Sequence, residues 1–219
     1  MRFLFVGGVV LSSALFCGCT FYVRHIEPAR YTVKILYSNE QLSGAALSGQ
    51  SVLLLPILTR DGPDTAHFPT PLEQSRMVGK VRDDLRFIFP QTFEKRYRDS
   101  EAGRDSGSLD RFFGNLYKGN VMAIQTSDSI WKAVDADFLI VVRIKYAATI
   151  RGFDGNASRR LIMEIELWNV AAIEAALRIE VIGFENRPGV TDVQFVMGAL
   201  KEAYGALPGR LPANNETDW

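Results

Sequence analysis

Three successive segments between residues 138 and 181 alternate apolar and charged side chains with a period of two. The apolar positions are Ile144 and Tyr146, then Leu161, Met163, Ile165 and Leu167, then Leu177, Ile179 and Val181, and the charged positions between them are Arg143 and Lys145, then Glu164 and Glu166, then Arg178 and Glu180. Because successive side chains of a strand point to opposite sides of a sheet, each segment predicts a β-strand with one apolar and one charged face. Turn residues at 153–156 favour a hairpin between the first two strands. Antiparallel strands of this kind need a cover on one side alone.

Two capping boxes predict the helices that supply this cover. Thr70-Pro71-Leu72-Glu73 combines a capping Thr, a Pro at the first helical position and a Glu that returns the capping hydrogen bond. The second box is Thr191-Asp192-Val193-Gln194. The apolar stripes that follow are Met77, Val81, Leu85 and Ile88 in the first helix, and Val196, Leu200, Ala203 and Leu207 in the second. Pro90 and Pro208 are expected to end the two helices.

The remaining segments complete the predicted fold. Residues 31–37 alternate like a short half-buried strand, 38–50 are expected to be a loop, and 51–58 predict a strand covered on both faces. The apolar run 138–142 favours a central strand. Short helices are expected from Ser108 and Ser127, and residues 94–111, dense in both charge signs, are expected to form a mobile excursion or an interface. The predicted fold class is α+β, with a mixed, largely antiparallel sheet and helices packed on one face of a single compact domain.

The N-terminus indicates export and lipidation. Arg2 precedes an apolar run that ends at Phe16, as in a signal peptide, and the run is too short for a permanent membrane span. A buried first strand is the alternative. The sequence Phe16-Cys17-Gly18-Cys19 resembles a bacterial lipobox. This resemblance implies that Cys19 carries a lipid anchor, and that Thr20 after it directs the protein to the outer membrane rather than the inner one.

Cleavage before Cys19 would divide the chain into four parts. The expected parts are a lipoprotein signal peptide at 1–18, a lipidated tether at 19–31, a globular α+β domain at 32–208 and a flexible tail at 209–219. A stable anchor of this kind needs more than one acyl chain, because a single chain gives only marginal membrane binding.

Composition argues against several classes of function. Basic and acidic residues number 25 each, a balance that argues against a nucleic-acid partner. Two His and two Cys leave little material for zinc fingers, iron–sulfur clusters or Cys–His catalysis. The sequence holds no phosphate-binding loop, dinucleotide fingerprint or nucleophile elbow. Asp61, Asp64 and His67 share a loop and are a weak alternative as a metal site. We therefore expect no cofactor, no metal and no enzyme activity.

Two groups of side chains are candidates for a functional site. Glu164 and Glu166 could serve as a carboxylate pair for acid–base hydrolysis. The structural alternative is that they form ion pairs with Arg143, Lys145 and Arg178 across the sheet. An aromatic cluster formed by Phe87, Phe89, Phe93 and Tyr97 is interpreted as core and helix-end packing, and whichever of its rings are exposed are the candidate partner surface.

The order of motifs resembles a superfamily of small envelope lipoproteins. The strand with Val52-Leu53-Leu54-Leu55-Pro56 is followed by an amphipathic helix, by Ala133-Val134-Asp135-Ala136-Asp137-Phe138-Leu139-Ile140-Val141, by a strand with Ile165-Glu166-Leu167-Trp168-Asn169-Val170, and by a last helix with Ala206-Leu207-Pro208. This order is similar to that of penicillin-binding-protein activators and curli secretion-channel lipoproteins.

The resemblance implies a function by contact. It predicts an outer-membrane-anchored periplasmic lipoprotein that binds, activates or assembles a cell-envelope machine, held by its N-terminal lipid and acting on envelope proteins whose identity, like the oligomeric state, stays open. One alternative is an auxiliary component of a lipid-transport or efflux system. The other is a periplasmic hydrolase that depends on Glu164 and Glu166.

Overall fold

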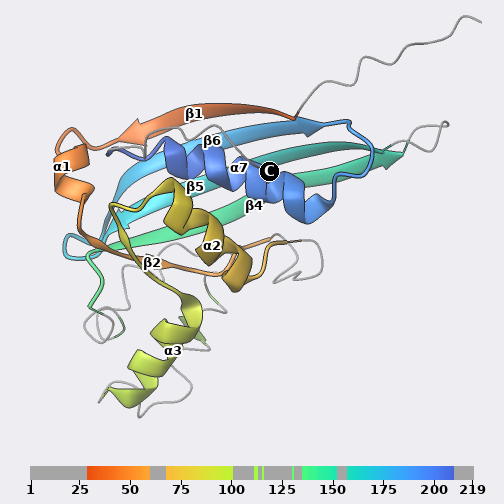
Figure 1. Cartoon of the computed structure of the whole chain (residues 1–219). Coiled ribbons are helices and arrows are strands. Elements are labelled where there is room, and N and C mark those ends of the chain that lie inside the picture. Colours follow the sequence, from red (N-terminus) through yellow and green to blue (C-terminus); the bar gives the residue numbers. More distant parts are fainter. Residues whose placement is uncertain are drawn as a thin grey trace, which may run out of the picture.

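The structure of the protein is a computed structural model that describes residues 29–59, 68–100, 111–112, 115, 130, 135–151 and 157–209. Its centre is a six-stranded sheet with the strand order β1-β6-β5-β4-β2-β3 (Figure 1). The strands are β1 (Arg30–Ser38), β2 (Ser51–Leu54), β3 (Arg86–Ile88), β4 (Phe138–Arg151), β5 (Ala157–Asn169) and β6 (Glu174–Glu185). The helices are α1 (Gly44–Leu47), α2 (Pro71–Val81), α3 (Pro90–Asp99) and α7 (Asp192–Gly205).

Strand pairing follows the predicted alternation. Strands β4, β5 and β6 pair antiparallel in chain order, and β1 pairs antiparallel with β6. Strand β2 lies parallel to both β4 and β3. The predicted α+β fold with a mixed, largely antiparallel sheet in one domain is therefore confirmed.

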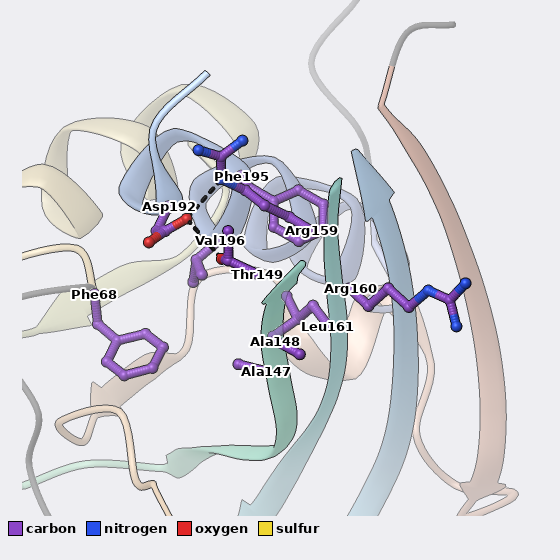
Figure 2. Close-up of a pocket in the computed structure, with 10 residues that line it drawn as sticks. All are labelled: Phe68, Ala147, Ala148, Thr149, Arg159, Arg160, Leu161, Asp192, Phe195 and Val196. Atoms are coloured by element: carbon purple, nitrogen blue, oxygen red, sulfur yellow. Dashed lines mark hydrogen bonds and ion pairs between the residues drawn. The ribbon is translucent and has the colours of Figure 1, made fainter. Parts of the chain in front are cut away.

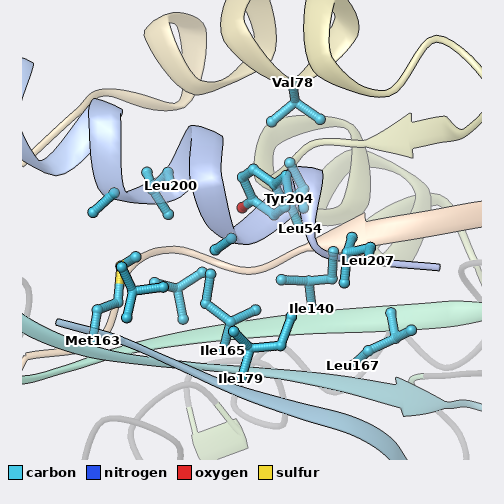
Figure 3. Close-up of a cluster of buried hydrophobic side chains, with 14 of the residues drawn as sticks. Leu54, Val78, Ile140, Met163, Ile165, Leu167, Ile179, Leu200, Tyr204 and Leu207 are labelled. Carbon is cyan, nitrogen blue, oxygen red and sulfur yellow. The ribbon is translucent and has the colours of Figure 1, made fainter. Parts of the chain in front are cut away.

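One side of the sheet, which we call the helix face, packs against α2 and α7. Ile140, Ile165 and Ile179 point from neighbouring strands toward Leu200 and Tyr204 of α7 (Figure 3). Both predicted capping boxes are present, at Thr70 and Thr191. Each fully buried aliphatic side chain contributes about 1.5 to 3 kcal/mol. This face therefore supplies most of the apolar stabilisation.

The opposite side, which we call the second face, has its own apolar cluster at one end. Leu53, Leu139 and Trp168 occupy the alternate positions of β2, β4 and β5 and pack with Phe93 and Tyr97 of α3. Helix α3 lies near β2 (Figure 1). The expectation of helices on one face thus holds for α2 and α7, whereas α3 packs on the other.

The first predicted helix is shorter than expected. It ends at Val81, and Arg82 after it has a non-helical backbone (φ −138°, ψ 74°). Residues 86–88 then pair with β2 as strand β3 instead of continuing the helix. Pro90 begins α3 rather than ending a helix, because a proline at the first helical position forfeits no internal hydrogen bond.

Two loop predictions also change. Residues 94–99, expected in a mobile excursion, belong to α3, and 101–110 lie outside the described residues. The loop predicted at 38–50 contains the short helix α1, whose N-cap Ser43 accepts a hydrogen bond from the Ala46 amide. Most of the two short helices predicted after Ser108 and Ser127 lies outside the described part of the chain, although Phe112 and Ile130 are buried in the second-face cluster.

Two glycines allow the start of β1 to dock against α7. Tyr31 stacks on Phe195 with 5.7 Å between ring centroids, and its hydroxyl donates to the Phe195 carbonyl at 2.9 Å. A Cβ at Gly198 would come within 2.7 Å of Tyr31 Cζ, and one at Gly183 within 2.9 Å of Phe195 Cζ. Burial raises the pKa of Tyr31 to about 12, with Glu185 nearby adding to the rise. The aromatic pair therefore fits only because both glycines lack a side chain.

Candidate functional site

The two candidate carboxylates lie within an ion-pair network on the second face. The register places Arg143 beside Glu164, and Glu166 between Val141 and Arg178. Glu166 Oε2 accepts from Arg143 Nη1 at 2.8 Å, and its Oε1 lies 2.9 Å from Arg178 Nη2. Only 2% of the Glu166 side chain is exposed. Each carboxylate oxygen is thus held by its own guanidinium group.

Glu164 is held in the same way by neighbouring cations. Its carboxylate lies 3.2 Å from Lys145 Nζ and 3.8 Å from Arg143 Nη1. On the same face, Lys34 Nζ of β1 lies 3.9 Å from Glu180 Oε1 of β6. The predicted pairing of Glu164 and Glu166 with Arg143, Lys145 and Arg178 is confirmed. The sequence pattern was sufficient to find it because opposite charges faced each other on adjacent strands.

The network is incompletely hydrogen-bonded within the described residues. Arg143 Nε and Nη2 and Arg178 Nε are buried without an acceptor among them. A buried donor left without a partner costs about 1 to 3 kcal/mol. Burying charges in this way is seldom a net gain in stability. The network therefore fixes the positions of its carboxylates but lowers the stability of the fold.

The aromatic cluster is part of the protein's own packing. Phe93 and Tyr97 are 0% and 2% exposed, with ring centroids 6.4 Å apart. Phe87 and Phe89 are half-buried against the helix-face core. Phe93 and Tyr97 are therefore not among the exposed rings that were the candidate partner surface, because the second-face cluster covers both. For Phe87 and Phe89 a partner surface stays a prediction.

A cavity of about 600 Å³ opens between β4, β5 and the start of α7. Its apolar lining includes Phe68, Leu161, Phe195 and Val196 (Figure 2). At its edge Arg159 Nε donates to Asp192 Oδ1 at 2.6 Å, and Arg160 adds a second cation to the lining. The volume is in the range of small-molecule sites, and the lining is mostly apolar. Sequence reasoning missed this cavity because its walls come from distant segments with no shared motif.

A second hollow, of about 720 Å³, lies at the other end of the sheet. The carboxylate of Asp137, one of its lining residues, accepts from the Ser51 amide at 2.8 Å and the Ser51 hydroxyl at 2.7 Å. Asp135 and Ile173 line it with positive φ angles of 54°. No group of three or more His, Cys, Asp or Glu suited to a metal occurs in the described part of the chain. Asp137 therefore acts as a brace between β2 and β4.

The predicted anchor lies outside the described residues. This applies to Cys19, the 1–18 segment and nearly all of the tether, and also to the loop with Asp61, Asp64 and His67. Within the part of the chain that the structure describes, every helix is too short or too polar to cross a bilayer.

The sequence matches no protein-family model and no curated protein. Solved structures are similar in backbone. The PelC dodecamer from Paraburkholderia phytofirmans shares 13% identity and a TM-score of 0.41, covering 83% of this chain and 100% of that chain. Lipoprotein GNA1162 from Neisseria meningitidis shares 12% identity and a TM-score of 0.46, covering 70% and 94%. Protein XCC0632 from Xanthomonas campestris shares 8% identity and a TM-score of 0.32, covering 80% and 89%. Such values assign no role to any residue of this chain. The expected likeness to penicillin-binding-protein activators and curli-channel lipoproteins stays a prediction.

Proposed function

We propose that this protein is an envelope lipoprotein, anchored through Cys19 at the outer membrane, that works by binding other molecules rather than by catalysis. The anchor rests on the apolar N-terminal run and on the Gly18-Cys19 pair. The binding role rests on the ion pairs that hold Glu164 and Glu166, the two carboxylates that were the best candidates for catalysis.

The observation that carries the binding role is the double pairing of Glu166. A general acid needs a transferable proton, and a general base needs a lone pair within reach of the substrate. Glu166 is 1% exposed and each of its oxygens is paired with a guanidinium group. Glu164 shares Arg143 with Glu166 and is also paired with Lys145. This arrangement supports a structural role for both carboxylates.

Two measurements test the proposal. Mass spectrometry of the membrane-bound protein should show a mature chain that begins at a diacylglycerol-modified Cys19, and Cys19→Ser should leave an unmodified precursor. Crosslinking in intact cells should then trap envelope proteins on the wild type. Maturation and membrane partition of Cys19→Ser like the wild type would refute the anchor. Loss of a hydrolytic activity in Glu164→Gln, with folding intact, would refute the non-catalytic role.

The cavity favours a second candidate function, the handling of a lipid or another amphiphile. Its walls are mostly apolar, and at its edge Arg159 is paired with Asp192 while Arg160 offers a cation, so an acyl chain with an anionic headgroup would fit both. Filling the cavity tests this idea. Ala147→Phe should abolish lipid carried through purification, as measured by native mass spectrometry. Ala172→Phe, on an exposed turn at the other end of the sheet, is the matched control. Equal lipid content in both variants would refute this function.

A further inference from the structure

The second face carries an exposed apolar patch at the end of the β4–β5 hairpin. We define this hairpin patch as Tyr146, Ile150, Arg160, Ile162, Ile182 and Phe184. Three of its residues lie opposite one another on adjacent strands, namely Tyr146, Ile162 and Ile182. Two residues further along, in the next pair on the same face, Arg160 lies opposite Phe184. The patch lies beyond the ion-pair network, at the opposite end of the second face from the cluster under α3.

The hairpin patch combines apolar exposure with positive charge. The exposed fractions of Tyr146 and Ile150 are 47% and 51%. Arg160 is exposed, with its guanidinium carbon 6.0 Å from the centre of the Phe184 ring. Arg160 also lines the edge of the cavity, and Figure 2 shows its guanidinium group directed away from the other labelled side chains. Tyr146 to Ile150 of β4 face residues of β5, which in turn pair with β6 and β1. Among the residues of these strands that lie on the second face at this level, the charged ones are Arg160 and Arg30. Aromatic, aliphatic and basic side chains together are typical of surfaces that contact anionic lipid.

The predicted tether joins the domain at the same end of the sheet as the hairpin patch. Strand β1 begins at Arg30, which is opposite Phe184 of the hairpin patch. Arg30 follows Cys19 by eleven residues, a reach of at most about 40 Å. The fourteen residues of β4 span about 46 Å. A lipid on Cys19 would therefore be joined to the domain at the patch end of the sheet.

We infer that the hairpin patch rests on the surface of an anionic phospholipid bilayer, as a second membrane contact besides the lipid anchor. This inference rests on the proposed lipidation of Cys19. Tyr146 and Ile150 enter the boundary between headgroups and acyl chains, where a tyrosine can keep its hydroxyl in contact with water. Arg160 contacts lipid phosphate. The contact orients the domain, so that α2 and α7 face away from the membrane surface and are available to protein partners.

Fluorescence quenching tests the inference on the lipidated full-length chain. A pyrene label is attached at Ile150→Cys, or at Ala172→Cys in the exposed β5–β6 turn as the control. Each protein is reconstituted in vesicles of phosphatidylethanolamine and phosphatidylglycerol that carry a headgroup nitroxide. We expect strong quenching at position 150 and weak quenching at 172. Arg160→Gln combined with Tyr146→Ser, or omission of phosphatidylglycerol, should reduce quenching at 150 toward the level at 172.

The outcomes separate the patch from the anchor. Equal quenching at 150 and 172 in protein that floats with the vesicles would overturn the membrane contact and leave the lipid anchor standing. Excimer emission from label 150 without quenching would assign the patch to a second copy of the chain and also overturn the inference. Failure of the wild-type protein to float would refute the anchor, and the patch contact with it.

Discussion

Each side of the sheet holds a buried charged group, and the two groups are satisfied differently. On the helix side, Arg82 is 0% exposed and each of its side-chain nitrogens donates a hydrogen bond, to Asp84 or to the carbonyls of Leu207 and Pro208. On the second face, Arg143 binds Glu166 but keeps two buried nitrogens without an acceptor among the described residues.

This difference indicates that the two buried charged groups contribute differently to the stability of the fold. The Arg82 cluster ties the end of α2 to the end of α7, so its hydrogen bonds close the helix layer. The network around Glu166 instead holds charged side chains in place between an apolar cluster and the hairpin patch. We expect the helix side to control folding, and the outer part of the second face to tolerate change.

The largest loss is expected for Asp84→Asn. The substitution leaves Arg82 buried without its counter-charge, which should lower the free energy of unfolding by about 4 kcal/mol at neutral pH. The hydrogen bonds from Arg82 hold the pKa of Asp84 below its ordinary value. A carboxylate with a lowered pKa adds stability above its unfolded pKa of about 3.9, and this stability is lost as the pH falls through the folded pKa. Urea unfolding from pH 2 to 7 should therefore show a flatter acid limb for the variant.

A somewhat smaller loss is expected for Glu166→Gln, at about 3 kcal/mol. The amide removes the charge shared by Arg143 and Arg178 inside a buried network. Glu180→Gln is the matched control, because its pair with Lys34 is long and the Lys34 side chain is 53% exposed, so the pair should contribute less than about 1 kcal/mol. Chemical denaturation measures both. Similar losses of unfolding free energy in the two variants would show that the burial of Glu166 does not make its ion pairs more important for stability than the pair of Glu180.

Gly198→Ala should lower the free energy of unfolding by about 2 kcal/mol. The new methyl group would overlap Tyr31 and push the start of β1 away from α7. Tyr31→Phe in the same chain should restore part of the loss, since it removes the atom nearest the added Cβ. A double-mutant cycle with no coupling between the two sites would contradict this explanation.

Tyr204→Phe is expected to act in the opposite direction. The Tyr204 hydroxyl is buried without a hydrogen-bond partner among the described residues, and burial raises its pKa. Removing it should increase the free energy of unfolding by about 1 kcal/mol, because no buried donor is then left unpaired. A decrease, measured by thermal or urea unfolding, would indicate a partner for the hydroxyl.

Tyr146→Ser should have the smallest effect on folding, within about 0.5 kcal/mol, because the ring is 47% exposed on the second face. Its midpoint of thermal unfolding should match that of the wild type. A large shift would show that the hairpin patch belongs to the core and would remove the contrast between the two sides.

Local patterns predicted the central sheet and both capped helices, because a period of two and a capping box are set by neighbouring residues. The same patterns failed at residues 82–90. Leu85 and Ile88 continued a helical stripe, yet they lie in different clusters on opposite faces of the sheet. Where the helix ends, Arg82 donates to the carbonyls of Leu207 and Pro208, more than a hundred residues away, and no local pattern contains these contacts. The cavity was missed for the same reason, since Phe68, Leu161 and Phe195 meet only in the folded chain.

Phe195 belongs to two assemblies at once. Its ring lines the cavity, and it also stacks on Tyr31 near the start of β1. Consider a molecule that binds in the cavity more tightly when the Phe195 ring is stacked on Tyr31. Its binding stabilises the docking of β1 on α7 by the same free energy by which docking favours its binding, because linkage between two sites is reciprocal. Occupancy of the cavity and docking of the first strand are thereby coupled through a single benzyl group.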